Sequence, residues 1–238
     1  MISSPTNDRV KKWMKLYLKK YRDNNYLILS SALVDEAYAH GFLDTLIYVG
    51  EKPFEFTNAF EVSEDVMAKL TKDKIEKYIG IGLKKSWNLE KDVKRIMILD
   101  ELQDPLNIGK ILNSAYAFGF DAIIASENTA DAYHEKSVLL SKGAIFKVPL
   151  FYTDIRAALS ELQSHNFKVY ATGLRANNYE LKEVPKSENM AFVLGNEGSG
   201  VENDIMDASD GVVKIDMCNI DSLNVAMAGA IVMYNFQK

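Results

Sequence analysis

The sequence contains almost no cysteine and no long apolar run, and each absence excludes a class of protein. Cys218 is the single cysteine in 238 residues, so an internal disulfide framework is excluded and a reducing compartment is expected. No apolar run approaches the roughly 18 residues that a membrane-spanning helix requires. Residues 1–24 contain no uninterrupted apolar core of the kind that marks a secretory signal. These absences predict a soluble, cytoplasmic protein.

Signatures of the common nucleotide and metal sites are also missing. There is no G-x-x-x-x-G-K-[ST] phosphate loop and no strand followed by G-x-G-x-x-G. His40, His134 and His165 are scattered, without cysteine or acidic residues at the spacing of metal ligands. We therefore expect no bound metal.

Positive charge is concentrated at the front of a chain whose net charge is −5. Residues 1–95 carry 17 basic and 14 acidic residues, whereas residues 96–238 carry 11 and 19. Residues 1–22 alone hold seven basic residues and one acidic residue. This asymmetry indicates a basic N-terminal region that meets a polyanion, although a solvated helix face would give the same pattern.

Apolar periodicity divides the chain into two α/β regions, and its composition, 47% hydrophobic and 26% charged, is that of an ordinary globular protein. In the first region we expect helices over 8–22, 33–40 and 63–70 and strands over 26–29, 45–49, 60–62 and 78–83. In the second we expect strands over 95–100, 121–125, 168–171, 190–194 and 212–215, with helices over 107–118, 153–163 and 222–236. Alternation of this kind is typical of a parallel sheet, and we place the domain boundary between residues 90 and 91.

Two segments of the second region place unusual residues after strands. The segment 104–119 opens a helix with Asn107, where unpaired N–H donors and a positive dipole are available, although a plain asparagine cap would look the same. The segment 191–200 runs from a buried strand into three glycines within six residues, with Glu197 at their centre. Glycines at this density let a backbone approach a ligand closely, and a simple tight loop does not require the carboxylate.

A third segment follows the last predicted strand. Ser222 is expected to cap the final helix, and Asn224 lies in its first turn. Small residues later in this helix permit close packing, but packing does not explain Ser-Leu-Asn.

Taken in this order, the three segments resemble the motifs of the SpoU/TrmH family of RNA ribose 2′-O-methyltransferases. The matching residues are Asn107 and Gly109 in the first motif, Gly195, Glu197 and Gly200 in the second, and Ser222, Leu223 and Asn224 in the third. The resemblance spans about residues 93–236. The front region, residues 1–90, is similar to the family's substrate-binding domain.

The resemblance implies an α/β fold of the SPOUT class: a Rossmann-like catalytic domain with a parallel sheet and a deep C-terminal trefoil knot, over residues 91–238. A small, ribosomal-protein-like α/β domain that binds RNA would precede it. The family acts as a homodimer and uses S-adenosylmethionine. By position, the implied cofactor-binding residues are Thr172, Gly173, Leu174, Leu194, Gly195, Asn196, Ile215, Met217 and Leu223. The implied catalytic residues are Asn107, Lys110, Asn113, Glu197, Ser222 and Asn224, and the RNA-binding residues are Arg9, Lys11 and Lys12.

One position departs from the family pattern, because Asn113 stands where the first motif has an arginine. An amide has neither the charge nor the two-pronged geometry of a guanidinium, so another cation must replace it for full activity. Lys110, on the same predicted helix face, is the first candidate, and Arg175 is the second. We expect a 2′-O-methyltransferase of structured RNA, of 23S rRNA rather than tRNA. The alternative is an RNA-binding paralogue that keeps the cofactor pocket with weak or absent catalysis.

Overall fold

The computed structural model describes residues 1–88, 92–175, 177–220 and 222–237. The chain forms two compact units, Met1–Ser86 with Asp131–Phe146, and Trp87–Ala130 with Lys147–Lys238. The boundary predicted between residues 90 and 91 lies outside the described residues. No helix in the described part of the chain is both long and apolar enough to cross a membrane.

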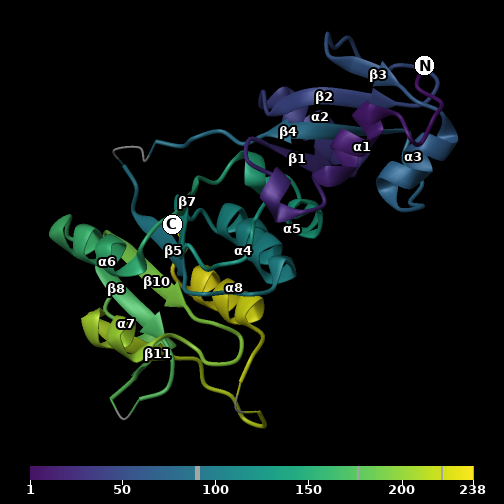
Figure 1. The fold of residues 1–238 in the computed structure, drawn as a ribbon. Coiled ribbons are helices and arrows are strands. Elements are labelled where there is room, and N and C mark those ends of the chain that lie inside the picture. Colours follow the sequence, from purple (N-terminus) through teal and green to yellow (C-terminus); the bar gives the residue numbers. More distant parts are fainter. Residues whose placement is uncertain (89–91, 176, 221, 238) are drawn as a thin grey trace. The chain divides into compact units, whose positions relative to one another are not determined.

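The first unit is a four-stranded sheet of order β1-β4-β2-β3, in which only β2 and β3 are parallel neighbours (Figure 1). Its helices are α1 (Asp8–Lys15), α2 (Ser31–Ala39), α3 (Glu64–Thr71) and α5 (Glu135–Leu140), with short 3-10 turns η1 (Lys19–Tyr21) and η2 (Ala144–Phe146). Its strands are β1 (Asn25–Ile28), β2 (Leu43–Tyr48), β3 (Ala59–Glu61) and β4 (Tyr78–Leu83). Apolar side chains of α1 and α3 cover one face of the sheet and form its core.

The segment Asp131–Phe146 packs into this first unit although it comes from the middle of the second region of the sequence. The Tyr133 ring lies 4.8 Å from that of Tyr26, and Phe146 lies 5.5 Å from Phe42. Arg22 Nε donates to Asp131 Oδ2 at 2.7 Å, and both side chains are almost fully buried. The Leu16 carbonyl accepts a second bond from Arg22, and α1 ends at Lys15, so the single helix predicted over 8–22 is wrong.

The second unit is a seven-stranded, fully parallel sheet of order β7-β6-β5-β10-β8-β11-β9. Its strands are β5 (Arg95–Leu99), β6 (Ala122–Ala125), β7 (Leu150–Tyr152), β8 (Lys168–Thr172), β9 (Tyr179–Glu180), β10 (Met190–Leu194) and β11 (Gly211–Lys214). Its helices are α4 (Pro105–Ala117), α6 (Ile155–Ser164), α7 (Asn203–Ala208) and α8 (Val225–Asn235), with the 3-10 turn η3 (Leu181–Glu183). Because residues 96–99 of β5, residues 169–171 of β8 and all of β10 are apolar and buried, the centre of the sheet is buried on both faces, as parallel sheets are.

Helices cover the two faces of this sheet. Apolar residues of α6 and α7 pack on one face, against the strand residues that include Ile98 and Val193. On the other face α4 and α8 pack against each other and against the sheet, and the Phe192 ring lies 4.5 Å from Phe236. A Cβ at Gly229 of α8 would lie 2.7 Å from Leu194, so glycine permits this close approach.

Helices α4 and α8 begin at other residues than the sequence predicted. Helix α4 is capped by Asp104, whose carboxylate accepts from the Leu106 N–H at 2.9 Å, and Pro105 occupies its first position. Asn107 is therefore no cap. Helix α8 begins at Val225 and is capped by Asn224, so the cap predicted at Ser222 is wrong. Strands β4 and β10 have the predicted bounds, whereas β7, β9, α5 and α7 were not predicted.

Candidate functional site

Three side chains that are distant in sequence form one hydrogen-bonded chain in the second unit. The Asn107 Nδ2 donates to Glu197 Oε1 at 3.0 Å, and Asn224 Nδ2 donates to Asn107 Oδ1 at 3.1 Å. Asn224 Oδ1 in turn accepts from the Ala226 N–H at 3.0 Å. These residues come from the first turn of α4, the loop after β10 and the start of α8. The structure thus brings all three predicted motifs to one place.

Glu197 is an ionised hydrogen-bond acceptor in this chain. Burial by itself raises the pKa of Glu197, but the N–H of Gln103, the side chain of Asn107 and the N–H of Asp104 together hold that pKa below its ordinary value. The two backbone bonds measure 3.0 Å from Gln103 and 3.2 Å from Asp104. Because the donors of Gln103 and Asp104 lie just before α4, the carboxylate ties the loop after β10 to the start of that helix.

The glycine-rich loop is folded so tightly that Gly195 admits no side chain. A Cβ there would lie 2.1 Å from both the Gly200 carbonyl carbon and the Val201 nitrogen. The Asn196 and Gly200 backbones exchange hydrogen bonds of 3.1 and 2.9 Å, and the Asn196 side chain donates to the Glu101 carbonyl at 2.8 Å. The loop is therefore fixed from within and from the end of β5.

The predicted cofactor-binding residues gather at one edge of the sheet. The carboxyl ends of β10, β8 and β11 are adjacent, and Thr172–Leu174, Leu194–Asn196 and Ile215–Met217 follow them. Open parallel sheets bind ligands in the crevice outside the carboxyl ends of their strands. Thr172 Oγ1 donates to the Val193 carbonyl at 2.9 Å and ties two of these strand ends together.

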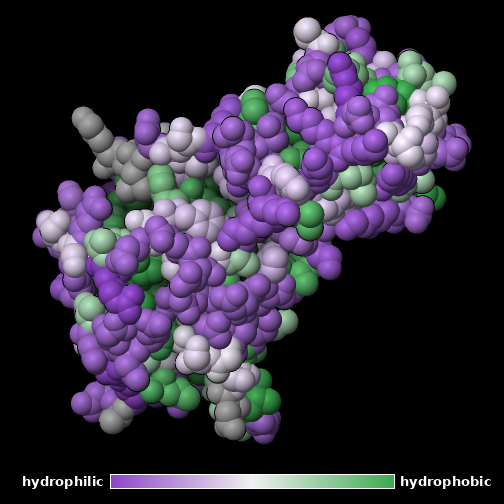
Figure 2. Space-filling view, in the orientation of Figure 1, coloured by the Kyte–Doolittle hydropathy of each residue, from purple (hydrophilic) through white to green (hydrophobic). Residues whose placement is uncertain are grey.

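Apolar side chains near this edge remain accessible. Ile215, Met217 and Leu223 are half-buried, and Leu174 and Ile220 are 64% and 57% exposed. Figure 2 shows hydrophobic side chains at the surface beside the loop that follows β11. Accessible apolar walls with a close glycine backbone fit a ligand that has a flat apolar part and polar edges.

The side chains of the remaining predicted catalytic residues make few contacts with the described residues. Lys110 and Asn113 are exposed on α4, and the side chain of neither makes a hydrogen bond or ion pair with any described residue. Ser222 is also exposed, without a hydrogen bond to the described part of the chain. Arg175 is held elsewhere: its guanidinium pairs with Asp207 and donates to the Asn203 carbonyl at 3.0 Å.

The predicted RNA-binding residues lie on α1 of the first unit and are exposed. Lys11 pairs with Asp8 at 3.1 Å, whereas the Arg9 guanidinium lies over the Phe60 ring, 4.3 Å from its centroid. Lys12 makes no ion pair with a described residue.

Two acids that support the site were not predicted. Asp104 caps α4, a role that its position before Pro105 could have indicated. Asp100 is 3% exposed at the end of β5 and accepts from the Glu202 N–H at 3.3 Å. Burial raises the pKa of Asp100 above its ordinary value, against the effect of that hydrogen bond. Only the tertiary structure shows that this acid is buried.

Comparison with known proteins places these features in a family. The sequence model of the SpoU rRNA Methylase family matches residues 94–234. The chain is 30% identical over 245 residues to 23S rRNA (guanosine(2553)-2′-O)-methyltransferase RlmP of Bacillus subtilis, covering 99% of this chain and 98% of that one.

Solved structures agree in fold. The AdoMet-bound rRNA methyltransferase from Sinorhizobium meliloti has a TM-score of 0.90 at 25% identity, covering 98% of this chain and 95% of the other. The SpoU methyltransferase AviRb from Streptomyces viridochromogenes has a TM-score of 0.86 at 22% identity, covering 96% of each chain. The α/β fold class predicted from the sequence is confirmed by these neighbours and by the parallel sheet. The chain belongs to the SpoU rRNA methylase family.

Proposed function

We propose that the protein methylates the 2′-hydroxyl of a ribose in 23S rRNA, with S-adenosylmethionine as methyl donor. The observation that carries this proposal is the hydrogen-bonded chain Glu197–Asn107–Asn224, which joins the three family motifs at the carboxyl edge of the parallel sheet. Similarity to RlmP extends over both units of the chain, so it includes the region that would select the RNA as well as the region that would transfer the methyl group. This favours rRNA over tRNA.

The loops after β8, β10 and β11 fit the cofactor. Ile215, Met217 and Leu223 provide apolar walls for an adenine. When bound, S-adenosylmethionine supplies the electrophilic methyl group, and the protein orients the hydroxyl and eases loss of its proton. Thr172, Gly173, Leu174, Leu194 and Asn196 complete the proposed set.

Glu197 and Asn224 act as positioning groups in this scheme. The ionised Glu197 carboxylate fixes the glycine-rich loop to α4, and Asn224 both caps α8 and holds Asn107. Ser222, exposed three residues before the start of α8, is available to the ribose. Preorganised hydrogen-bonding groups of this kind need no rearrangement during the reaction, which is how they lower its barrier.

Lys110 is the proposed substitute for the arginine that Asn113 replaces. It is an exposed cation one turn before Asn113 on α4, and no described acid neutralises it. Arg175 is less suitable, because Asp207 and Asn203 already hold its guanidinium. A positive charge here stabilises the oxyanion that develops as the ribose hydroxyl loses its proton.

The second candidate function is an RNA-binding paralogue without methyl transfer, and Asn113 is the observation that favours it. An exposed amide at this position supplies no charge to a developing oxyanion. Such a protein would retain the cofactor loops and the basic α1. Turnover is the property that separates the two candidates.

A homodimer is the proposed working form. Met227, Ile231 and Tyr234 form a stripe on α8 and are 58%, 39% and 64% exposed. Tyr116 on the adjacent α4 is 53% exposed. Apolar side chains clustered in this way mark an interaction surface, and a second copy would also bring further groups near α4. Sedimentation of the wild-type protein and of Tyr234→Lys tests this, with a monomeric wild type as the contrary result.

The first unit, with Arg9, Lys11 and Lys12, is proposed to bind the RNA, and residues 91–238 to carry the transfer. The cytoplasm is the protein's proposed location, since the proposed substrate is ribosomal RNA. The deciding experiment is methyl transfer from labelled S-adenosylmethionine to rRNA and tRNA from a strain that lacks the protein. Label at one ribose of 23S rRNA is the expected result. Cofactor binding without any incorporation would instead support the non-catalytic paralogue.

A further inference from the structure

A small groove lies beside α1 on the sheet of the first unit. It has a volume of about 380 Å³, and its lining includes Arg9, Lys12, Trp13, Thr45, Asn58 and Phe60. Thr45 pairs with Ile81, and Ile47 pairs with Phe60, so their side chains share the sheet face on which α1 packs. The groove is the part of this face at the margin of α1.

A flat cationic surface is already assembled in the groove. The Arg9 guanidinium lies 4.3 Å from the centroid of Phe60, and the Trp13 ring lies 5.6 Å from that of Phe60. Proteins bind unpaired RNA bases by stacking them on aromatic rings and on guanidinium planes. Arg9 is exposed, so its outer face is open to such a base.

Charge along the rim suits a nucleic-acid backbone. Arg9 and Lys12 make no ion pair with any described acid, whereas Lys11 is neutralised in part by Asp8 at 3.1 Å. Lys15 is exposed one turn further along α1. The one carboxylate of the lining, Asp44, accepts a hydrogen bond from the Thr45 hydroxyl at 2.7 Å and can also accept from N–H groups of a base.

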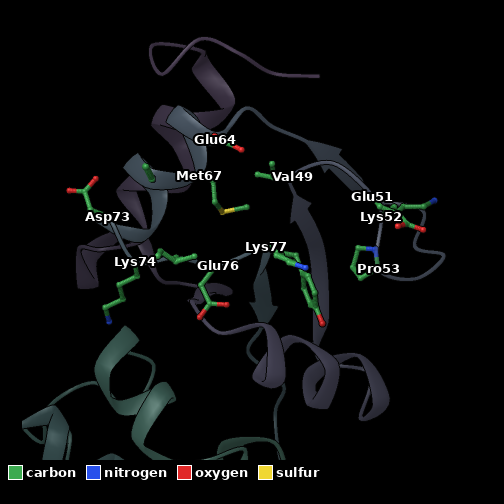
Figure 3. Close-up of a pocket in the computed structure, with 13 residues that line it drawn as sticks. Val49, Glu51, Lys52, Pro53, Glu64, Met67, Asp73, Lys74, Glu76 and Lys77 are labelled. Carbon is green, nitrogen blue, oxygen red and sulfur yellow. The ribbon is translucent and has the colours of Figure 1, made fainter.

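A second groove of the same unit provides the contrast. It is larger, about 920 Å³, and lies between α3, the end of β2 and the loop before β4 (Figure 3). Its lining includes four carboxylates, Glu51, Glu64, Asp73 and Glu76, against three lysines. This balance disfavours a polyanion, so the basic groove beside α1 is the better site for RNA.

We propose that the groove beside α1 holds one unpaired nucleotide of the RNA substrate, with its base stacked on the Arg9 guanidinium that lies over Phe60 and its phosphates against Lys12. A volume of about 380 Å³ is at the lower end of the roughly 300–1,000 Å³ range of small-ligand sites, which suits one nucleotide. The bases of a duplex are paired and stacked on each other, so they are not free to stack on Arg9. This inference rests on the proposed function, because it assigns a role within binding of the same RNA.

The test measures binding of a fluorescein-labelled oligouridylate of about ten nucleotides to the full-length protein. Arg9→Gln and Lys12→Gln should each weaken binding on the order of 10-fold, and Lys12→Gln, which removes a phosphate contact, should also lower the salt-dependence slope by about 1. Phe60→Leu should weaken binding by a similar factor with the slope unchanged, because it removes the ring that holds the Arg9 guanidinium in place and no charge. Lys74→Gln, an equal loss of charge in the acidic groove, is the matched control and should leave binding unchanged.

Quenching of tryptophan fluorescence tests the position of the RNA, because a change in the protein's net charge does not by itself alter the emission. The chain has two tryptophans, so Trp87→Phe leaves Trp13 as the sole reporter, and the oligouridylate should quench it. An RNA duplex of the same length should bind more weakly and quench less. Unchanged Trp13 emission at saturating RNA, or an equal effect of Lys74→Gln and Lys12→Gln, would overturn the proposal.

Methyl transfer to 23S rRNA separates this inference from the proposed function. Arg9→Gln and Lys12→Gln should raise KM about 10-fold and leave kcat unchanged, since they alter binding alone. Normal transfer with an unaltered KM in both variants would refute the groove but not the enzyme. No transfer by the wild type, with the oligouridylate pattern intact, would refute the enzyme but not the groove.

Discussion

The Asn107 side-chain amide donates to the Glu197 carboxylate at 3.0 Å across 90 positions of sequence. Asn107 is 3% exposed in the first turn of α4, so the bond fixes the glycine-rich loop to a rigid helix. The same amide accepts from Asn224 at 3.1 Å through its oxygen. Asn107 thus donates to a carboxylate and accepts from an N–H donor at once, because its amide carries both a donor and an acceptor.

Asn107→Asp is expected to remove this double role. It replaces a donor by a second carboxylate beside Glu197, and the repulsion displaces the loop. We expect methyl transfer in single turnover to fall by about 10²–10³ at neutral pH, the usual cost of losing one preorganised donor. Asn166→Asp, the same change at an exposed turn after α6, is the control and should retain the wild-type rate. Equal rates for the two variants would contradict the positioning role.

The pH dependence of stability should reveal the charge on Glu197. Its pKa lies below the ordinary 4.5, because N–H donors outweigh the burial that raises it. The stabilisation by the ionised carboxylate is therefore complete above pH 4.5 and is lost as the pH falls through the lower folded-state pKa. Glu197→Gln should lower the unfolding temperature at neutral pH, and the difference from wild type should shrink in that acidic window. A difference that is constant with pH would show that the charge contributes nothing.

Substitutions on α4 test which cation serves the reaction. Lys110→Ala should lower kcat by roughly 10²–10³, and adding Asn113→Arg to that variant should restore most of the loss. Lys186→Ala removes an exposed lysine elsewhere in the second unit and serves as control. An unchanged kcat in Lys110→Ala, measured on the mapped rRNA site, would eliminate Lys110.

Two glycines of one loop should respond differently to alanine. A Cβ at Gly195 would lie 2.1 Å from backbone atoms of Gly200 and Val201, whereas at Gly198 the nearest atom is Asn196 Oδ1 at 3.5 Å. Gly195→Ala should cost about 3 kcal/mol or more in unfolding free energy, because backbone must move. Gly198→Ala should cost less than about 1 kcal/mol. Urea unfolding of the two variants measures both losses. Equal losses would contradict the close contact between Gly195 and the backbone of Gly200 and Val201.

The buried ion pair Arg22–Asp131 should stabilise the first unit. Removing one partner of Arg22–Asp131 leaves an uncompensated buried charge, so Asp131→Asn and Arg22→Met should each cost about 3–5 kcal/mol. The double variant should lose much less than the sum of the two. Additive losses in the double-mutant cycle would show that the two charges are not coupled.

The sequence by itself determined the position of most strands of the sheets and the identity of the motifs. Buried strands such as β10 and β4 were predicted with their bounds, because each is an apolar run of five or six residues, a length typical of strands and short for a helix. The three motif segments were recognisable because glycines around a carboxylate, or Ser-Leu-Asn at a helix start, are not required by packing. The departure at Asn113 was equally visible in the sequence.

Only the tertiary structure decided which residues meet. Asn224 and Asn107 are 117 positions apart, and their contact depends on α4 and α8 lying on the same face of the sheet. The same holds for Arg22 and Asp131, 109 positions apart, which place the segment 131–146 in the first unit. The periodicity of apolar residues indicates which side of each segment is buried. Which distant residues come into contact depends on strand order and helix packing, and these cannot be read from a single sequence.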